Sequence, residues 1–204
     1  MIFENKGEMI RMIEQAREDM LEQLGIKDIE DIIKYKPVEL ASGKISEYYV
    51  DIKKSYGWPG VLLGYANYMI ASIGFGISDI SCVVGGGHGG VPLATILSSR
   101  LIAWNTKLAL VRDIPKSHGK TDPIDGYPLG KLNKGRKLLI VDDVFTTGGS
   151  IKKIIKVLPK DLAIEVFVIC NRSGIEKPEI NGTEVKYLFT VEDLTEYLEN
   201  HSSD

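Results

Sequence analysis

Cysteine is scarce in this sequence. Only Cys82 and Cys170 occur among 204 residues, and each lies inside an apolar run. Small folds stapled by disulfides or built around structural zinc use more cysteines, so neither class fits this chain. We expect both cysteines to be buried free thiols in a reducing compartment.

Long apolar runs and long basic runs are also missing. Nowhere do about 18 apolar residues follow one another, as a transmembrane helix requires. The N-terminal stretch MIFENKGEMIRMIEQARED is charged throughout and lacks the apolar segment of a signal peptide. With a net charge of −3 and no Lys/Arg cluster, a nucleic-acid partner is not expected. We expect a soluble cytoplasmic protein that binds small molecules, with no membrane partner.

The N-terminal quarter of the chain predicts helices followed by a strand. Apolar residues recur at three- and four-residue spacing over 8–24, which predicts an amphipathic helix ending at a glycine. A second short helix is expected over 29–36, and the aromatic, β-branched stretch 45–54 predicts a strand. We expect residues 1–60 to form a small hood on a single domain whose α/β core covers 61–204.

From residue 61 onward, short and continuously apolar strands alternate with helices. The expected strands cover 80–84, 107–112, 137–141, 163–170 and 185–189, and the expected helices cover 65–73, 91–102, 150–158 and 191–199. This pattern is typical of the α/β class, with a central, mostly parallel sheet flanked by helices. In such folds, ligands bind at the carboxyl ends of the strands.

One expected connection is unusually long. Residues 113–136 separate two strands and are rich in Gly, Pro, Asp and Lys. Connections beyond about 12–15 residues are uncommon in compact domains and are usually functional loops or disordered inserts. We expect a mobile loop here that acts as a lid.

The stretch LLIVDDVFTTGGSI, residues 138–151, places two carboxylates at the end of an apolar strand. Successive strand side chains point to opposite faces, so either Asp142 or Asp143 can face a ligand while neighbours or a metal hold the other. The turn behind them leads into a helix whose first amides are available to an anion. The turn residues are Thr146, Thr147, Gly148, Gly149 and Ser150. Carboxylates beside a phosphate site suit a sugar phosphate, because acids accept hydrogen bonds from its hydroxyls.

A second glycine-rich stretch, Gly85–Gly90, also lies between a strand and a helix. Alone, it is equally compatible with a structural turn. Two such loops in one sheet would suit a substrate with phosphate groups at both ends, with Gly87 and Gly89 letting the backbone approach closely. His88, between them, either contacts the phosphates or caps the turn.

The acid pair with its Thr-Thr-Gly-Gly-Ser turn resembles the 5-phosphoribosyl 1-pyrophosphate (PRPP) signature of the type I phosphoribosyltransferases. Within that family, residues 20–199 look like an orotate phosphoribosyltransferase. The segments that carry the resemblance are LASGKISEYYVDIK, GGVPLAT, VRDIPKSHGKT, VICNRSG and FTVEDL. The resemblance implies the type I fold, a homodimer, and transfer of phosphoribose from PRPP to orotate in pyrimidine (UMP) biosynthesis.

The resemblance also assigns roles toward the phosphates and the sugar. Lys116 and His118 look like the catalytic pair on the mobile loop, where they would meet the departing pyrophosphate together with Arg112. In the family, the arginine sometimes reaches across the dimer interface, so residues 112–120 would contribute to the partner's site. Asp142 and Asp143 belong to the catalytic set, and the two glycine-rich loops would hold the phosphates of PRPP.

For the base and the metal, the resemblance names fewer groups. Arg172 would pair with the pyrimidine, and Thr146 would contribute to that site. Tyr48 and Tyr49 would supply ring surface, although strand alternation lets only one of them face the pocket. Mg²⁺ would be held mainly by substrate oxygens and water, with Asp142 as a possible protein ligand and no dedicated metal cage.

The sequence departs from the family at a few positions. Ala41 stands where many members have a Lys before the Ser-Gly of this segment, and Asp113 stands where the loop commonly has a second cation. Lys44 and Ser46 lie in the same segment as Ala41, and we expect Lys44 to be solvated. Two alternatives therefore stay open: transfer to another nucleobase, or a PRPP-binding regulatory protein of the same fold.

Overall fold

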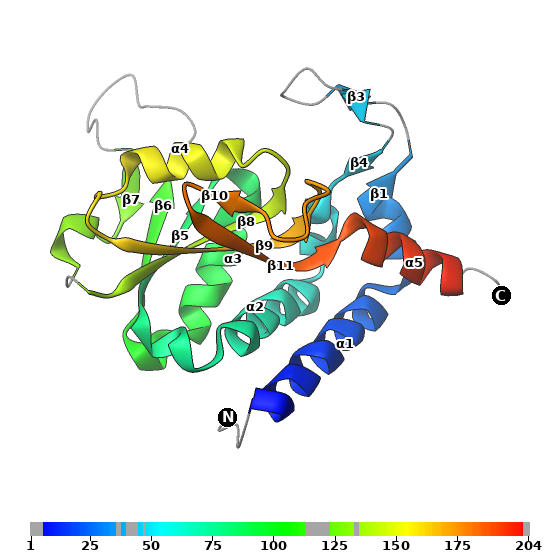
Figure 1. Cartoon of the computed structure of the whole chain (residues 1–204), viewed down its shortest axis with the longest axis horizontal. Helices are drawn as coiled ribbons and strands as arrows, with labels where there is room; N and C mark the ends of the chain where they lie inside the picture. The colour runs from blue at the N-terminus through cyan, green and yellow to red at the C-terminus, as the bar shows by residue number, and fades with distance from the viewer. Residues whose placement is uncertain are drawn as a thin grey trace.

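The centre of the fold is a seven-stranded sheet with the order β10-β11-β9-β8-β5-β6-β7 (Figure 1). The structure, a computed structural model, describes residues 6–35, 38–39, 45–46, 48–112, 123–132 and 135–201. The strands are β5 (Ile80–Gly86), β6 (Lys107–Val111), β7 (Ile124–Gly126), β8 (Lys137–Phe145), β9 (Ala163–Asn171), β10 (Glu179–Ile180) and β11 (Thr183–Thr190). The five inner strands run parallel, and the edge strands β7 and β10 run antiparallel to their neighbours. The predicted α/β class is confirmed.

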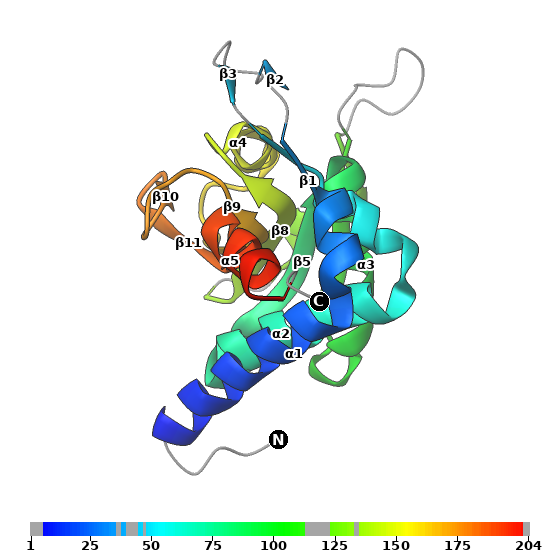
Figure 2. The same cartoon turned by 90° about the vertical axis from the view of Figure 1, so that its right-hand side faces the viewer.

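Helices cover both faces of this sheet (Figures 1 and 2). One face packs against α2, α3 and α5, and the other against α4, whereas α1 packs on α2 and α5. The helices are α1 (Lys6–Ile32), α2 (Pro59–Ile73), α3 (Gly87–Arg100), α4 (Gly149–Val157) and α5 (Val191–His201), with short 3-10 helices η1 (Ile52–Gly57), η2 (Gly74–Asp79), η3 (Ile102–Trp104) and η4 (Leu129–Lys131). In the described ranges, every helix is too short or too polar to cross a membrane.

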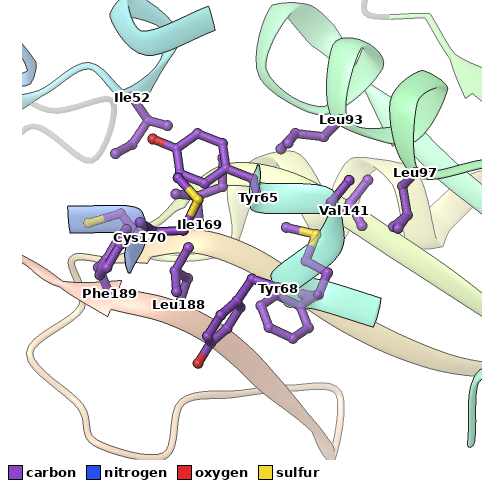
Figure 3. Close-up of a cluster of buried hydrophobic side chains, with 14 of the residues drawn as sticks. Ile52, Tyr65, Tyr68, Leu93, Leu97, Val141, Ile169, Cys170, Leu188 and Phe189 are labelled. Atoms are coloured by element: carbon purple, nitrogen blue, oxygen red, sulfur yellow. The ribbon is translucent and has the colours of Figure 1, made fainter. Parts of the chain in front are cut away.

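Alternation along the buried strands builds the two faces. In β8, Leu139 and Val141 pack on the side of α2 and α3, whereas Leu138 and Ile140 pack on the side of α4. Figure 3 shows the first cluster, where side chains of α2 and α3 meet those of β8, β9 and β11. Both faces are buried, so the strands are continuously apolar in sequence, which is why the sequence predicted them well.

Cys82 and Cys170 are buried free thiols, as predicted. Burial raises the pKa of both thiols to about 12. They therefore stay protonated and unreactive, and their part in the fold is apolar packing.

The N-terminal region differs from its prediction. The break expected after residue 24 is a kink at Gly25 (φ 70°) within α1, which ends at Ile32, before the predicted end at residue 36. The single strand predicted over 45–54 is wrong. Two-residue strands β1 (Ile33–Lys34) and β4 (Tyr49–Val50) pair with each other, as do β2 (Val38–Glu39) and β3 (Ile45–Ser46), and η1 follows them. The hood formed by residues 1–60 stays a prediction.

The prediction that Gly85–Gly90 forms a loop is also wrong. β5 extends to Gly86, and α3 begins directly at Gly87, which has a φ of 60°. A Cβ atom at Gly85 would lie 2.3 Å from the carbonyl oxygen of Gly90. Glycine thus lets the first turn of α3 lie against the end of β5 without an intervening loop.

Two more element boundaries differ from their predictions. Asp142 and Asp143 lie within β8 instead of after it, because pairing with β9 continues to Phe145. The predicted loop 113–136 is interrupted by β7, which pairs with β6, and by η4. Residues 113–122 and 133–134 lie outside the described residues.

Candidate active site

A cavity of about 460 Å³ opens where β5 and β8 end. It brings the two predicted motifs together in one place. The predicted residues that line it are Gly87, His88, Gly89, Arg112, Asp142, Asp143 and Ser150. The position agrees with the general rule that α/β proteins bind ligands at the carboxyl ends of their parallel strands.

A second cavity of about 500 Å³ lies between α1 and α5. Its lining is rich in acidic side chains, which include Glu14, Glu18, Glu22 and Glu196. It contains neither the acid pair nor a glycine-rich helix start. We therefore assign the candidate active site to the cavity at β5 and β8.

Asp142 is 4% exposed and well supplied with hydrogen bonds. Its Oδ2 accepts a bond from the Ser150 hydroxyl at 2.5 Å, and its Oδ1 accepts one from the backbone N–H of Asp143 at 3.0 Å. Burial and then the charge of Asp143 raise the pKa of Asp142 to about 7, against the opposing effect of Ser150. The carboxyl thus changes its charge near neutral pH, where a cation or hydroxyl donor would favour its ionised form.

Asp143 lies between η1 and the start of α3. Its Oδ2 accepts a hydrogen bond from Lys53 Nζ at 3.1 Å, and the same ammonium lies 2.8 Å from Asp51 Oδ1. A Cβ atom at Gly89 would lie 2.2 Å from Asp143 Oδ1. Only a glycine at residue 89 therefore leaves room for the carboxylate, which joins the acid pair to the glycine-rich motif.

The Thr146–Ser150 turn forms the start of α4. Gly148 has a left-handed backbone (φ 71°), and the helix begins at Gly149. The first amides of a helix have no partner within the helix and carry partial positive charge, which suits a phosphate. Ser150 reaches the cavity, whereas Thr146, Thr147, Gly148 and Gly149 lie outside its lining.

Arg112 lies at the cavity but is held by its own chain. Its Nε and Nη2 donate to the two carboxylate oxygens of Asp125 at 2.6 and 2.8 Å, and its backbone N–H donates to Pro123 O at 3.0 Å. The pair ties the end of β6 to β7. Contact of Arg112 with pyrophosphate stays a prediction.

Three of the predicted base-binding residues, Tyr48, Thr146 and Arg172, lie near the ends of β8 and β9. Arg172 directly follows β9, and its backbone N–H donates to Phe145 O at 2.8 Å. Its Nη1 is buried and has no hydrogen-bond partner within the described part of the chain. Burial and then the charge of Glu192 raise the pKa of Tyr48, whereas the charge of Arg172 lowers it. The Tyr48 phenol therefore lies within electrostatic range of the Arg172 guanidinium. Tyr49 is half-buried at the β1–β4 pair.

The loop that carries Arg172 is fixed by its neighbour Asn171, which is 3% exposed. The side-chain oxygen of Asn171 accepts hydrogen bonds from the backbone and hydroxyl of Ser173, at 3.0 and 2.7 Å. Its amide nitrogen donates to Ile175 O at 2.8 Å. The backbone on both sides of Arg172 is therefore anchored.

Several predicted residues lie outside the described residues. They are Lys116, His118, Ala41, Lys44 and Asp113, and nothing of the Ser46 side chain is described. Their roles stay predictions.

The sequence interpretation missed Lys53, Tyr56 and Asp125. Lys53 lies in the family-like segment EYYVDIK, which was predicted as a strand. Because the segment is a 3-10 helix at Lys53, that prediction could not show that its side chain reaches Asp143. Asp125 was hidden in a region predicted as one loop. In the structure, Ile52 and Ser55 of η1 are both buried, and their three-residue spacing is that of a 3-10 helix.

Comparison with known proteins agrees with this geometry. The phosphoribosyl transferase domain family matches residues 76–192, which is more than half of the chain. An orotate phosphoribosyltransferase of Methanocaldococcus jannaschii is 36% identical over 167 residues, which cover 79% of this chain and 89% of that protein. The crystal structure of orotate phosphoribosyltransferase from Aeropyrum pernix superposes with a TM-score of 0.68 at 26% identity, covering 88% of this chain and 98% of that one.

A structure of the Mycobacterium tuberculosis orotate phosphoribosyltransferase in complex with PRPP has the same fold, with a TM-score of 0.58 at 18% identity over 88% of this chain and 92% of that one. The fold and the paired motifs define a type I phosphoribosyltransferase. The chain belongs to the phosphoribosyltransferase family and, within it, to the orotate phosphoribosyltransferases.

Proposed function

We propose that this protein transfers the phosphoribosyl group of PRPP to orotate and releases orotidine 5'-monophosphate and pyrophosphate, as a step of UMP biosynthesis. A ring nitrogen of orotate forms a bond to the anomeric carbon of the ribose as the bond from that carbon to pyrophosphate breaks, and the proton of the nitrogen is released. Negative charge then grows on the leaving group, while the sugar gains cationic character. The observation that carries the proposal is that the acid pair, the glycine-rich start of α3 and Ser150 in the first turn of α4 line one cavity.

PRPP fits this cavity because its two ends are both anionic and its middle carries hydroxyls. The start of α4 would bind the 5-phosphate, and the start of α3 would bind the pyrophosphate, since each supplies backbone amides. Asp142 and Asp143 lie in the lining between these helix starts and would accept hydrogen bonds from the ribose hydroxyls.

Orotate differs from uracil by a carboxylate, and Arg172 supplies a group suited to it. A buried guanidinium nitrogen without a partner is costly, and a carboxylate is its best-matched acceptor. Tyr48, which lies near Arg172, would offer ring surface to the pyrimidine. The anchored loop around Asn171 would hold this arrangement in place.

The acid pair also fits Mg²⁺. Burial, and then the charge of Asp143, raise the pKa of Asp142, so a nearby cation would stabilise the ionised form of Asp142. Asp142 would contribute oxygen to the ion beside substrate oxygens and water. When bound, Mg²⁺ would offset the charge of the leaving pyrophosphate.

The proposal includes a homodimer in the cytoplasm. Lys116 and His118 would neutralise and protonate the leaving pyrophosphate, and residues 112–120 would do so in the partner's site. The resemblance to the family supports this arrangement, and the length of the 113–122 connection is compatible with it. His88, which is exposed at the cavity, would contact the pyrophosphate.

The proposal is tested by following orotate consumption spectrophotometrically with PRPP and Mg²⁺ each present or omitted. A panel with uracil, adenine and guanine in place of orotate, read as pyrophosphate release, tests the base. We expect turnover with orotate that requires both PRPP and Mg²⁺. Turnover with another base but none with orotate would contradict the proposal, as would nucleic-acid binding by a protein inactive with every base.

A further inference from the structure

A short helix outside both predicted motifs reaches the candidate active site. η1 is anchored by Ser55, which is 1% exposed. Its hydroxyl donates to Ile52 O at 2.6 Å and lies 3.0 Å from the hydroxyl of buried Tyr65 in α2. The backbone of η1 is therefore fixed against α2, while two of its side chains, Lys53 and Tyr56, extend toward the site.

Tyr56 fixes the start of α3. Its hydroxyl donates to Gly89 O at 3.0 Å. Burial raises the pKa of Tyr56, and the charge of Asp143 raises it further, so the phenol remains a donor. The first turn of α3, which would hold pyrophosphate, is thereby tied to η1.

Lys53 fixes the acid pair. Its ammonium contacts Asp143 at 3.1 Å and Asp51 at 2.8 Å, so its charge is shared between two carboxylates. Asp143 is 14% exposed, and its other oxygen lies against Gly89. The carboxylate thus has an ammonium on one side and the α3 backbone on the other, which leaves it few orientations.

We propose that Lys53 is a positioning residue for phosphoribosyl transfer, which holds Asp143 in the orientation that accepts the ribose hydroxyls. It acts through Asp143, because its ammonium is already paired with two carboxylates and is not a free cation for pyrophosphate. The inference rests on the proposed function for the identity of PRPP. Transfer to orotate and the role of Lys53 are nevertheless tested by different measurements.

The first measurement is the affinity for PRPP with Mg²⁺, by calorimetry and without any base. Lys53→Met keeps the aliphatic stem and removes the charge, and we expect it to weaken PRPP binding about tenfold, the size of one charge-assisted hydrogen bond. Lys53→Arg should restore affinity to within about threefold of the unmodified protein. Lys54→Met is the matched control, since Lys54 is exposed on the same helix, and it should leave affinity unchanged.

The second measurement repeats Lys53→Met in the Asp143→Asn background. If Lys53 acts through Asp143, its loss there should change PRPP affinity by less than about twofold, since the partner is already altered. A persisting tenfold loss would overturn the proposal, because Lys53 would then act independently of Asp143. No loss in the single variant would also overturn it. Thermal unfolding checks that each variant is folded. If Lys53→Met does not fold, Lys53→Gln replaces it in this double-mutant cycle with Asp143→Asn.

The two proposals fail in different ways. Absence of orotate turnover in a protein that binds PRPP contradicts the function but leaves the Lys53 cycle valid. A failed cycle in an active enzyme contradicts only the role of Lys53. In the active enzyme, Lys53→Met should raise the KM for PRPP more than it lowers kcat.

Discussion

At the scale of single residues, the ionisation of Asp142 makes the stability of the folded protein depend on pH, and we expect the same of PRPP binding. Its pKa is raised from 3.8 to about 7, so between these values the folded protein holds a proton that the unfolded chain releases. The stabilising contribution of this carboxyl is therefore fully present below about pH 4 and is lost as the pH rises through about 7. As Asp142 ionises near neutral pH, its buried charge lowers the stability of the unliganded protein.

Asp142→Asn removes the titration, so we expect the variant to be more stable than the unmodified protein at about pH 8, by roughly 1–3 kcal/mol. The difference should shrink toward about pH 5. Thermal unfolding of both proteins across this pH range measures it. A difference that does not vary with pH would show that the carboxyl is not protonated in the folded state. The same variant should bind PRPP more weakly, since it loses a charged acceptor.

Arg172 gives a second prediction at this scale, for the base. If Arg172 binds the carboxylate of orotate as proposed, Arg172→Met should raise the KM for orotate about 10- to 100-fold and change the KM for PRPP less than about twofold. Lys177→Met, which removes a charge from an exposed position in the same loop, is the control. Steady-state kinetics with each substrate varied measures both constants. Equal losses for both substrates would contradict a base-binding role.

At the scale of elements, the contact of α3 with β5 depends on a glycine. A Cβ atom at Gly85 would lie 2.3 Å from Gly90 O and 2.7 Å from the Cβ of Ala94. Gly85→Ala should therefore lower the free energy of unfolding by about 1–3 kcal/mol, because α3 must move away from the strand. Denaturant unfolding measures this loss. Gly130→Ala is the control, since nothing lies within 4 Å of its added Cβ, and an equal loss there would refute the steric explanation.

The same scale shows how far the sequence predicts the structure. The strands buried on both faces were predicted because their apolar residues are continuous, as in β8 and β9. The edge strands β7 (Ile124–Gly126) and β10 (Glu179–Ile180) were missed, because strands of three and two residues are too short to show an alternating or continuous apolar pattern. η1 was mistaken for a strand because Tyr49 and Val50 favour one locally, whereas packing of Ile52 and Ser55 against α2 decides its conformation.

For the site, the local motifs predicted the acid pair and the glycines that line the cavity. They did not predict the residues that hold these side chains in position. The acid pair and the glycines are contiguous in sequence, so their proximity within each motif was visible. Lys53, by contrast, lies 90 positions from Asp143, and only the tertiary fold brings them together. The pairing of Arg112 with Asp125 depends in the same way on β7 returning beside β6.

At the scale of the whole molecule, the proposed dimer makes a test by subunit mixing possible. Lys116→Ala and Asp143→Asn should each be nearly inactive alone. If Lys116 acts in the partner's site, a mixed dimer contains one site with both defects and one intact site. An equal mixture after subunit exchange should then recover about a quarter of the unmodified activity. No recovery, with exchange verified by mass spectrometry, would place Lys116 in its own subunit's site.

The most direct test of the whole account is a crystal structure of this protein with orotidine 5'-monophosphate. We predict that the phosphate lies at the start of α4, the ribose hydroxyls at Asp142 and Asp143, and the base carboxylate at Arg172. A nucleotide bound away from the ends of β5 and β8 would contradict the account.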